Sequence, residues 1–140
     1  MQTPRSPKDE IAGLPYFPRL CDKIRLKQAD QLDPEYHPNL GKGMDLWTCQ
    51  YLGVDYKELE QQVIQGANDP QALEWARQHG CKRTESETDW WCSFMRNRGF
   101  RDDLSHRLQE RKAESGLGDR EDIQSFMDYI DADEGRMALE

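Results

Sequence analysis

FPRLCDKIRLKQ, residues 17–28, is the stretch of sequence that decides the fold class. Its apolar residues Phe17, Leu20 and Ile24 recur at intervals of three and four, so they share one face of an α-helix. Pro18 suits the first turn, because the N–H that proline lacks has no partner there in any helix. The stretch therefore predicts an amphipathic helix that packs through this face.

Charged residues lie beside the apolar face of this helix. Asp22 is three residues from both Arg19 and Arg25, a spacing at which side chains on a helix can pair. The set could hold an anionic ligand at the edge of a pocket, with a guanidinium making paired hydrogen bonds. It could equally be a structural ion pair between neighbouring helices, which is the commoner role. Lys23 and Lys27 point away from the apolar face and are expected to be solvated.

Similar signals divide the rest of the chain into short helices. Asp or Thr precedes several apolar periodic segments as an N-cap, and glycine follows them as a stop signal. The predicted helices cover residues 17–29, 43–52, 55–66, 69–80, 84–99, 101–114 and 119 onward. Residues 30–42, with two prolines and a glycine, form a long connection. No segment shows the alternation expected of a strand.

The sequence thus predicts an all-α fold, a single compact domain of six to seven short helices. The domain covers residues 1–138, with an irregular N-terminal arm at 1–15 that is rich in proline. Leu139 and Glu140 could be a cloning remnant and are set aside. The predicted core consists of Phe17, Leu20, Ile24, Trp47, Tyr51, Leu59, Val63, Leu73, Trp91, Phe94, Phe126 and Ile130.

The net charge of −8 argues against general nucleic-acid binding. The charge is uneven along the chain. Between Arg96 and Lys112 six basic residues outnumber three acidic ones, whereas from Asp119 onward eight acidic residues outnumber two basic ones. The two segments could neutralise each other in the fold, or the first could form a basic patch for an anion or an acidic partner.

The cysteines and the hydropathy pattern indicate a cytoplasmic protein without a metal. None of the four cysteines forms a CxxC pair, and no histidine lies at metal-ligand spacing from them. Cys21, Cys49 and Cys92 fall within helical patterns and should be buried free thiols. There is no signal peptide and no apolar run long enough to span a membrane. We therefore expect no cofactor and no membrane contact.

The tryptophans are the remaining candidates for a binding surface. Trp75, Trp90 and Trp91 could line a pocket, although aromatic residues more often fill a core. Trp90 and Trp91 are adjacent and must point in different directions on a helix. One of them should be partly exposed and is a candidate for contact with a partner.

Other motifs are incomplete. The tail from Asp131 begins like a calcium-binding loop, but the chain ends before the bidentate glutamate is due. Residues 41–43, Gly-Lys-Gly, lack the other elements of a phosphate-binding loop. The three histidines are scattered over a loop, a helix end and a surface helix. No catalytic nucleophile or base is predicted.

Four segments resemble a known family. They are LPYFPRLCDKIR at 14–25, LGVDY at 52–56, the helix around Trp75, and DREDIQSFMDYIDADEGR at 119–136. Together they look like the small bacterial domain-of-unknown-function family 5069. The resemblance spans nearly the whole chain and implies a bacterial origin and a single α-helical domain. It transfers no catalytic residue.

The sequence does not determine a function, and three hypotheses remain. The first is a non-enzymatic binding or protein-interaction module of the bacterial cytoplasm, with an unknown protein partner. The second is a protein or enzyme that binds a small anionic ligand in a pocket beside the first helix, through Arg19, Asp22, Arg25, Trp75 and Trp91. The third is a homo-oligomer that pairs through an exposed tryptophan.

Overall fold

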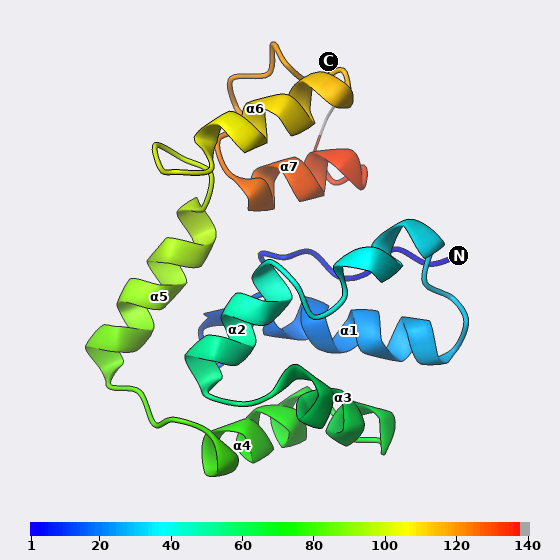
Figure 1. Ribbon diagram of the computed structural model, residues 1–140, viewed down its shortest axis with the longest axis vertical. Helices are drawn as coiled ribbons and strands as arrows, with labels where there is room; N and C mark the ends of the chain where they lie inside the picture. The colour runs from blue at the N-terminus through cyan, green and yellow to red at the C-terminus, as the bar shows by residue number, and fades with distance from the viewer. Residues whose placement is uncertain (138–140) are drawn as a thin grey trace.

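The structure, a computed structural model, describes residues 1–137 and is built almost entirely of helices (Figure 1). Within these described residues, seven α-helices and one 3-10 helix follow a short hairpin of two strands, in which Glu10 pairs with Pro15 and Ile11 with Leu14. The elements are β1 (Glu10–Ile11), β2 (Leu14–Pro15), α1 (Phe17–Gln28), η1 (Pro34–Asn39), α2 (Met44–Leu52), α3 (Tyr56–Ile64), α4 (Asp69–His79), α5 (Glu85–Asn97), α6 (Ser105–Glu114) and α7 (Phe126–Asp133). The all-α prediction is confirmed, and the arm predicted to be irregular contains the hairpin.

Helix α1 is the centre of the fold. Phe17, Leu20 and Ile24 are buried, as their spacing predicted, and they belong to the main hydrophobic cluster. The helix contacts α3, α4 and the hairpin. Burying large apolar side chains in this way stabilises a fold by about 1.5–3 kcal/mol each, so this face accounts for much of the docking of α1.

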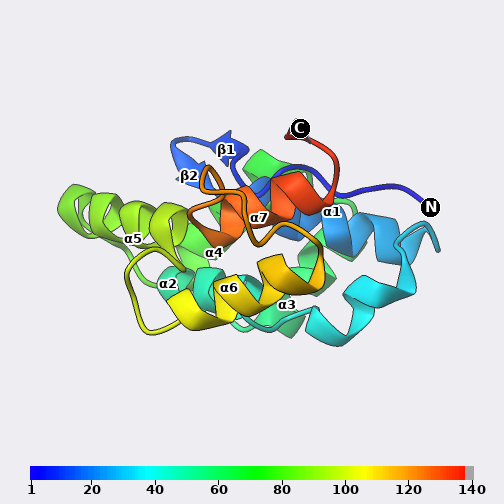
Figure 2. The same ribbon diagram turned by 90° about the horizontal axis from the view of Figure 1, so that it is seen from above.

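The helices form two parts joined by α5. Helices α1 to α4 make the lower body in Figure 1, and α5 runs upward along its side to the pair α6 and α7. Seen from above, α7 overlaps α1 and α6 overlaps α2 (Figure 2). The N-terminal arm reaches α7, where Lys8 bonds Asp128 at 2.6 Å and Ser6 bonds Asp131 at 2.8 Å. The N-terminal arm therefore helps to hold the α6–α7 pair on the body.

Several predicted helix starts are confirmed by their caps. Thr84 and Glu87 form a capping box at α5, in which each side chain accepts the backbone N–H of the other residue. Helix α4 has the same motif at Asn68, one residue before the predicted start. Gly53 ends α2 in the left-handed conformation that a side chain disfavours.

The predicted start of the last helix is wrong. Asp119 does not cap it: the segment after it forms turns, in which Arg120 pairs with Asp122, and α7 begins only at Phe126 with Ser125 as its cap. A buried lysine explains the interruption. Lys112 donates to two carbonyls of this segment, and a helix there would have used both.

The predicted core is confirmed for most of its residues. The prediction that Phe94 belongs to the core is wrong, because 43% of its surface is exposed. Helix α5 projects beyond α2 and is covered along one side, where Cys92 and Met95 are its buried residues. Cys21 and Cys49 are buried as well, and both are free thiols. Among residues 1–137, no helix combines the length and the hydrophobicity of a transmembrane segment.

Candidate functional site

A cavity of about 420 Å³ lies between the two parts of the molecule. Helices α1, α2 and the segment η1 form one side of it, and α6 and α7 form the other. We call it the interhelical cavity. Its volume is in the range of small-molecule sites. Its apolar lining comes from Met44, Trp47, Leu104, Phe126 and Ile130.

Three polar side chains from the body meet on one side of this cavity. The ammonium group of Lys23 donates to Oδ1 of Asp45 at 2.7 Å and to the hydroxyl of Tyr16 at 2.9 Å. The hydroxyl of Tyr16 in turn donates to Oδ1 of Asp45 at 2.6 Å. Lys23 is 6% exposed and Asp45 is fully buried. A buried charge pair of this kind needs every one of its hydrogen bonds.

Local backbone structure holds this triad of Tyr16, Lys23 and Asp45 in place. The other oxygen of Asp45 accepts the backbone N–H of Gly41 at 3.0 Å, which ties the start of α2 to the preceding loop. Tyr16 has φ at 74°, in the left-handed region that residues with a side chain seldom adopt. Backbone strain of this kind persists where the surrounding contacts over-determine it. Packing and the two bonds of its hydroxyl supply those contacts.

Burial changes the proton affinities of the triad. It lowers the pKa of Lys23 below its usual value, because the charged form loses its water, although the charge of Asp45 acts in the opposite direction. Burial also raises the pKa of Tyr16 well above its usual value, and the neighbouring Asp45 adds to this. Tyr16 is therefore a hydroxyl donor at neutral pH, and Lys23 gives up its proton more readily than an exposed lysine.

A second polar cluster joins the body to α7. The guanidinium of Arg19 makes two parallel hydrogen bonds of 2.8 Å to the carboxylate of Glu134. The hydroxyl of Tyr36, in η1, donates to the same carboxylate at 2.7 Å. The side chains of Arg19 and Glu134 are 4% and 6% exposed. Paired bonds from arginine to carboxylate are among the strongest in proteins, so this cluster fixes α7 against α1.

The second cluster is ionised. Burial alone would raise the pKa of Glu134, but the bonds and the charge of Arg19 outweigh burial and hold it below its usual value. Burial would lower the pKa of Arg19, yet its bonds to Glu134 raise it. Tyr36 stays protonated, because burial and the nearby carboxylate both raise its pKa.

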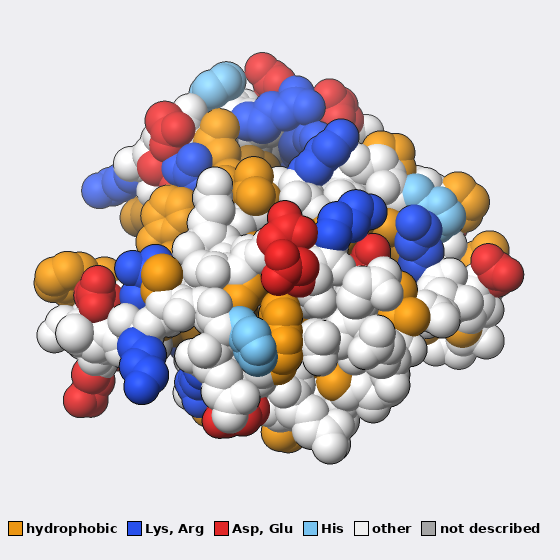
Figure 3. Space-filling view, turned by 60° about the horizontal axis from the view of Figure 1, so that its bottom comes forward, with side chains coloured by type: hydrophobic (Ala, Val, Ile, Leu, Met, Phe, Trp, Pro, Cys, Tyr) orange, Lys and Arg blue, Asp and Glu red, His pale blue; other side chains and the backbone are white. Residues whose placement is uncertain are grey.

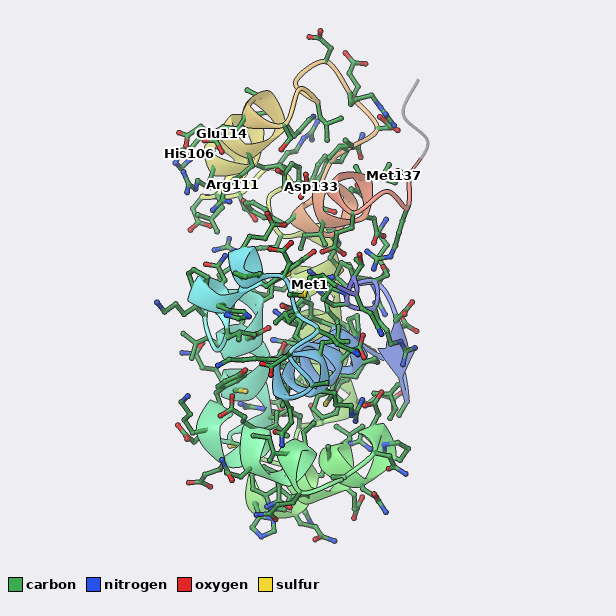
Figure 4. All side chains as sticks on the ribbon, turned by 90° about the vertical axis from the view of Figure 1, so that its right-hand side faces the viewer. Met1, His106, Arg111, Glu114, Asp133 and Met137 are labelled. Atoms are coloured by element: carbon green, nitrogen blue, oxygen red, sulfur yellow. The ribbon has the colours of Figure 1, made fainter. Side chains whose placement is uncertain are left out.

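The outer part of the cavity lining is basic. Lys42, Arg107 and Arg111 are exposed there, beside the acidic Asp133. Figure 3 shows Lys and Arg side chains gathered along the upper edge of one face, over α6. Figure 4 shows Arg111 on the side of α6 toward η1 and Asp133 on the neighbouring α7. Within the part of the chain that the structure describes, neither Lys42 nor Arg111 pairs with a carboxylate.

The sequence-predicted set on α1 is divided between different places. Arg19 lines the interhelical cavity. Asp22 accepts the backbone N–H of Arg5 at 2.9 Å, and it does not take the helical neighbours that its spacing allowed. Arg25 faces the other way and pairs with Asp69 at 2.7 Å. Arg25 does border a hollow beside the first helix, an open one of about 620 Å³ that is formed with α3 and α4.

The predicted tryptophans lie elsewhere again. Trp75 stacks on His79 along α4, with ring centres 5.0 Å apart. Trp91 stacks on Tyr51 at 4.4 Å, in a second surface hollow of about 520 Å³ between α2 and α5. Trp90 is 71% exposed. Of the five predicted site residues, Arg19 alone lines the interhelical cavity.

The triad was missed from the sequence. Lys23 was expected to be solvated, and this was wrong: the side chain is buried against Tyr16 and Asp45 of α2, which helical periodicity cannot reveal. One signal existed: Tyr16 directly precedes α1 and lies seven residues, about two helical turns, before Lys23, so its hydroxyl is within reach of that flank. A second was Asp45, an acid in the first turn of an otherwise apolar helix.

The comparisons with known proteins identify a family but no activity. Residues 1–136 match the family described as Domain of unknown function (DUF5069). No curated protein matches the chain. Among residues 1–137, no group of three or more His, Cys, Asp or Glu side chains is arranged to hold a metal ion.

Proposed function

Because the chain belongs to the DUF5069 family, whose description names no activity, we propose its function from the interhelical cavity. The protein binds a small organic anion there. The observation that carries the proposal is the charge of the lining. Five basic side chains and two acidic ones line the cavity, in a chain whose net charge is −8.

The basic residues have different roles. Arg19 and Lys23 are held by Glu134 and Asp45, so they shape the inner wall. Lys42 and Arg111 are exposed at the outer part and leave their donors for a ligand. A local excess of positive charge beside a low-dielectric wall concentrates anions. An anionic group would therefore lie near Arg111.

The apolar lining defines the rest of the ligand. Trp47, Leu104 and Phe126 offer a surface for a ring or an aliphatic chain. Ligand sites commonly combine such a lining with a few placed polar groups. The basic and apolar lining thus favours a phosphorylated or carboxylated compound with an apolar part, rather than a bare inorganic ion.

Phenyl phosphate is a suitable probe, since it joins an anion to a ring. We expect calorimetry to detect its binding at low salt, with benzyl alcohol, which is neutral, binding much more weakly. Replacement of Arg111 by glutamine should weaken binding by about tenfold or more, because a hydrogen bond to a charged group contributes about 1.5–3 kcal/mol.

The matched control is Arg101→Gln. Arg101 is exposed, lies over the ring of Phe100 and does not line the cavity, so this variant changes the net charge equally. It should leave phenyl phosphate binding almost unchanged. Equal weakening by the two substitutions, or no binding to the wild type, would refute the site.

A second candidate function is the pairing of two copies through the aromatic surface of α5. Trp90 and Phe94 are exposed beside the hollow that holds Trp91. Aromatic residues are enriched at protein interfaces relative to the rest of the surface, and a patch of exposed apolar side chains marks a contact site. Light scattering should then give the mass of a dimer for the wild type and of a monomer for Trp90→Ser. A monomeric wild type at high concentration argues against this pairing.

We also infer that the protein acts in the cytoplasm of a bacterium. The free thiols of Cys21, Cys49 and Cys92 support a reducing compartment. Detection of the protein in the membrane or periplasmic fraction of its source cells would contradict this location.

A further inference from the structure

The amine of Lys23 combines three features that suit reaction with a carbonyl group. It lines a cavity large enough for a small molecule. It touches a carboxylate, Asp45, that can take its proton, and a hydroxyl, Tyr16, that can return one. An ammonium group has three N–H donors, and these two partners occupy two of them. The third is available toward a ligand.

The chain contains a second buried lysine for comparison. Lys112 is 3% exposed, more buried than Lys23. Its ammonium group donates to the backbone carbonyls of Arg120 at 2.6 Å and Ile123 at 3.0 Å. Those carbonyls accept hydrogen bonds but, unlike a carboxylate, cannot take a proton. Lys112 does not line the interhelical cavity, so its role is to hold the turn before α7.

We propose that Lys23 is a nucleophile that forms an imine with the carbonyl group of an anionic ligand bound in the interhelical cavity. The inference rests on the proposed function, because the cavity must first hold an anion. The ligand class is an aldehyde or ketone that carries a carboxylate or phosphate, such as a 2-oxo acid. Lys42 and Arg111 would hold the anionic end.

The triad can balance every proton of this reaction. Asp45 takes one proton from the ammonium of Lys23, and the free electron pair of nitrogen attacks the carbonyl carbon. The carbonyl oxygen becomes a hydroxyl with a proton from Tyr16, which the nitrogen then reprotonates. Asp45 passes its proton to the hydroxyl of Tyr16, which gives its own proton to the ligand hydroxyl, and that hydroxyl leaves as water when the C=N bond forms.

The products need no additional reagent. Two of the three ammonium hydrogens leave with the carbonyl oxygen as water, and the third stays on the iminium nitrogen. The positive charge therefore remains beside the carboxylate of Asp45, and the ion pair is preserved. Burial favours the first step, since the pKa of Lys23 lies below its usual value.

Glyoxylate with sodium cyanoborohydride tests the proposal, because it is an anion with an aldehyde and its imine is reduced to carboxymethyl-lysine. Peptide mass spectrometry of the wild type should show Lys23 modified faster than the exposed Lys27 at neutral pH. We expect a difference of severalfold or more, because the cavity holds the anion beside Lys23 and a lowered pKa raises the fraction of neutral amine. Lys112 should remain unmodified.

Three further results connect the reaction to the site. Phenyl phosphate should slow the modification of Lys23 but not that of Lys27. Lys27→Arg should keep the rapid reaction, and Lys23→Arg should abolish it. Tyr16→Phe removes one hydroxyl and should slow the reaction while phenyl phosphate still binds.

The comparison of three lysines in one wild-type protein decides the matter even if Lys23→Arg does not fold. Modification of Lys23 no faster than that of Lys27 overturns the inference. If phenyl phosphate binds and depends on Arg111 in that case, the anion site stands and the chemistry alone is wrong. Absence of phenyl phosphate binding overturns the proposed function itself.

Discussion

Replacement of Glu134 by alanine is expected to lower the free energy of unfolding by about 3–5 kcal/mol, the usual cost of leaving a buried charge without its partner. Arg19 is 4% exposed and would keep one backbone carbonyl, that of Arg5, as its acceptor. Tyr36 would lose the acceptor of its hydroxyl as well. The loss should appear as a lower midpoint in urea, with the α6–α7 pair opening first.

A matched control separates this effect from that of removing any acidic side chain. Glu110 pairs with Arg107 on the exposed face of α6, where solvent screens the interaction. Glu110→Ala should therefore change the urea midpoint very little. Similar midpoints for the two variants would show that the buried pair does not hold α7.

The same pair of Arg19 and Glu134 should make the stability of the protein fall in acid. The pKa of Glu134 is lower in the folded chain than its ordinary value of 4.5, so its contribution to stability is complete above that pH. As pH falls from there through the lower folded pKa, the unfolded chain binds the proton first and the contribution is lost. Glu134→Gln should flatten this part of the stability curve, measured by urea unfolding between neutral and acid pH.

Replacement of Asp45 by alanine should have a comparable effect, again about 3–5 kcal/mol. The substitution leaves the buried ammonium of Lys23 with the hydroxyl of Tyr16 as its remaining partner, and it frees the backbone N–H of Gly41. Two mechanisms therefore add: an unpaired buried charge and a lost bond between the loop and α2. Unfolding in urea, followed by tryptophan fluorescence, measures the loss.

A double variant tests whether the unpaired charge of Lys23 causes the loss of stability in Asp45→Ala. Lys23→Met with Asp45→Leu removes both charges and fills similar volume, and such replacements are often neutral or stabilising. It should recover most of the stability that Asp45→Ala loses, while abolishing the glyoxylate reaction at position 23. A double variant as unstable as Asp45→Ala would mean that shape or the Gly41 bond, rather than charge, is decisive.

Local patterns allowed most of the fold to be predicted. The face of α1 with Phe17 and Leu20, and the cap at Thr84, depend on residues within two turns of one another. Such features follow from helix geometry and from the unsatisfied N–H groups of a first turn. Predictions failed where distant groups competed. The helix expected from Asp119 is replaced by turns because Lys112, on another helix, takes the carbonyls.

The candidate site depends on contacts that no local pattern records. Arg19 could be selected from the sequence as a functional candidate, but its partner Glu134 is 115 residues away. Lys23 was expected to be solvated because it lies off the apolar stripe of α1. It is buried because Tyr16 and α2 cover that flank, and α2 supplies Asp45. Burial of a charge is therefore a property of the neighbours that the fold brings, not of the helix that carries it.

By itself, the sequence determined the helical class, the role of FPRLCDKIRLKQ as the centre of packing, and the family. The helical class and the packing face follow from spacing and capping signals, which involve residues close together in the sequence. The family follows from motifs spread along residues 1–136. The tertiary structure alone decided which charges of that stretch are exposed, which are buried, and which line a cavity. The reason is physical: apolar periodicity fixes one face of a helix, whereas the surroundings of its other faces depend on where distant helices dock.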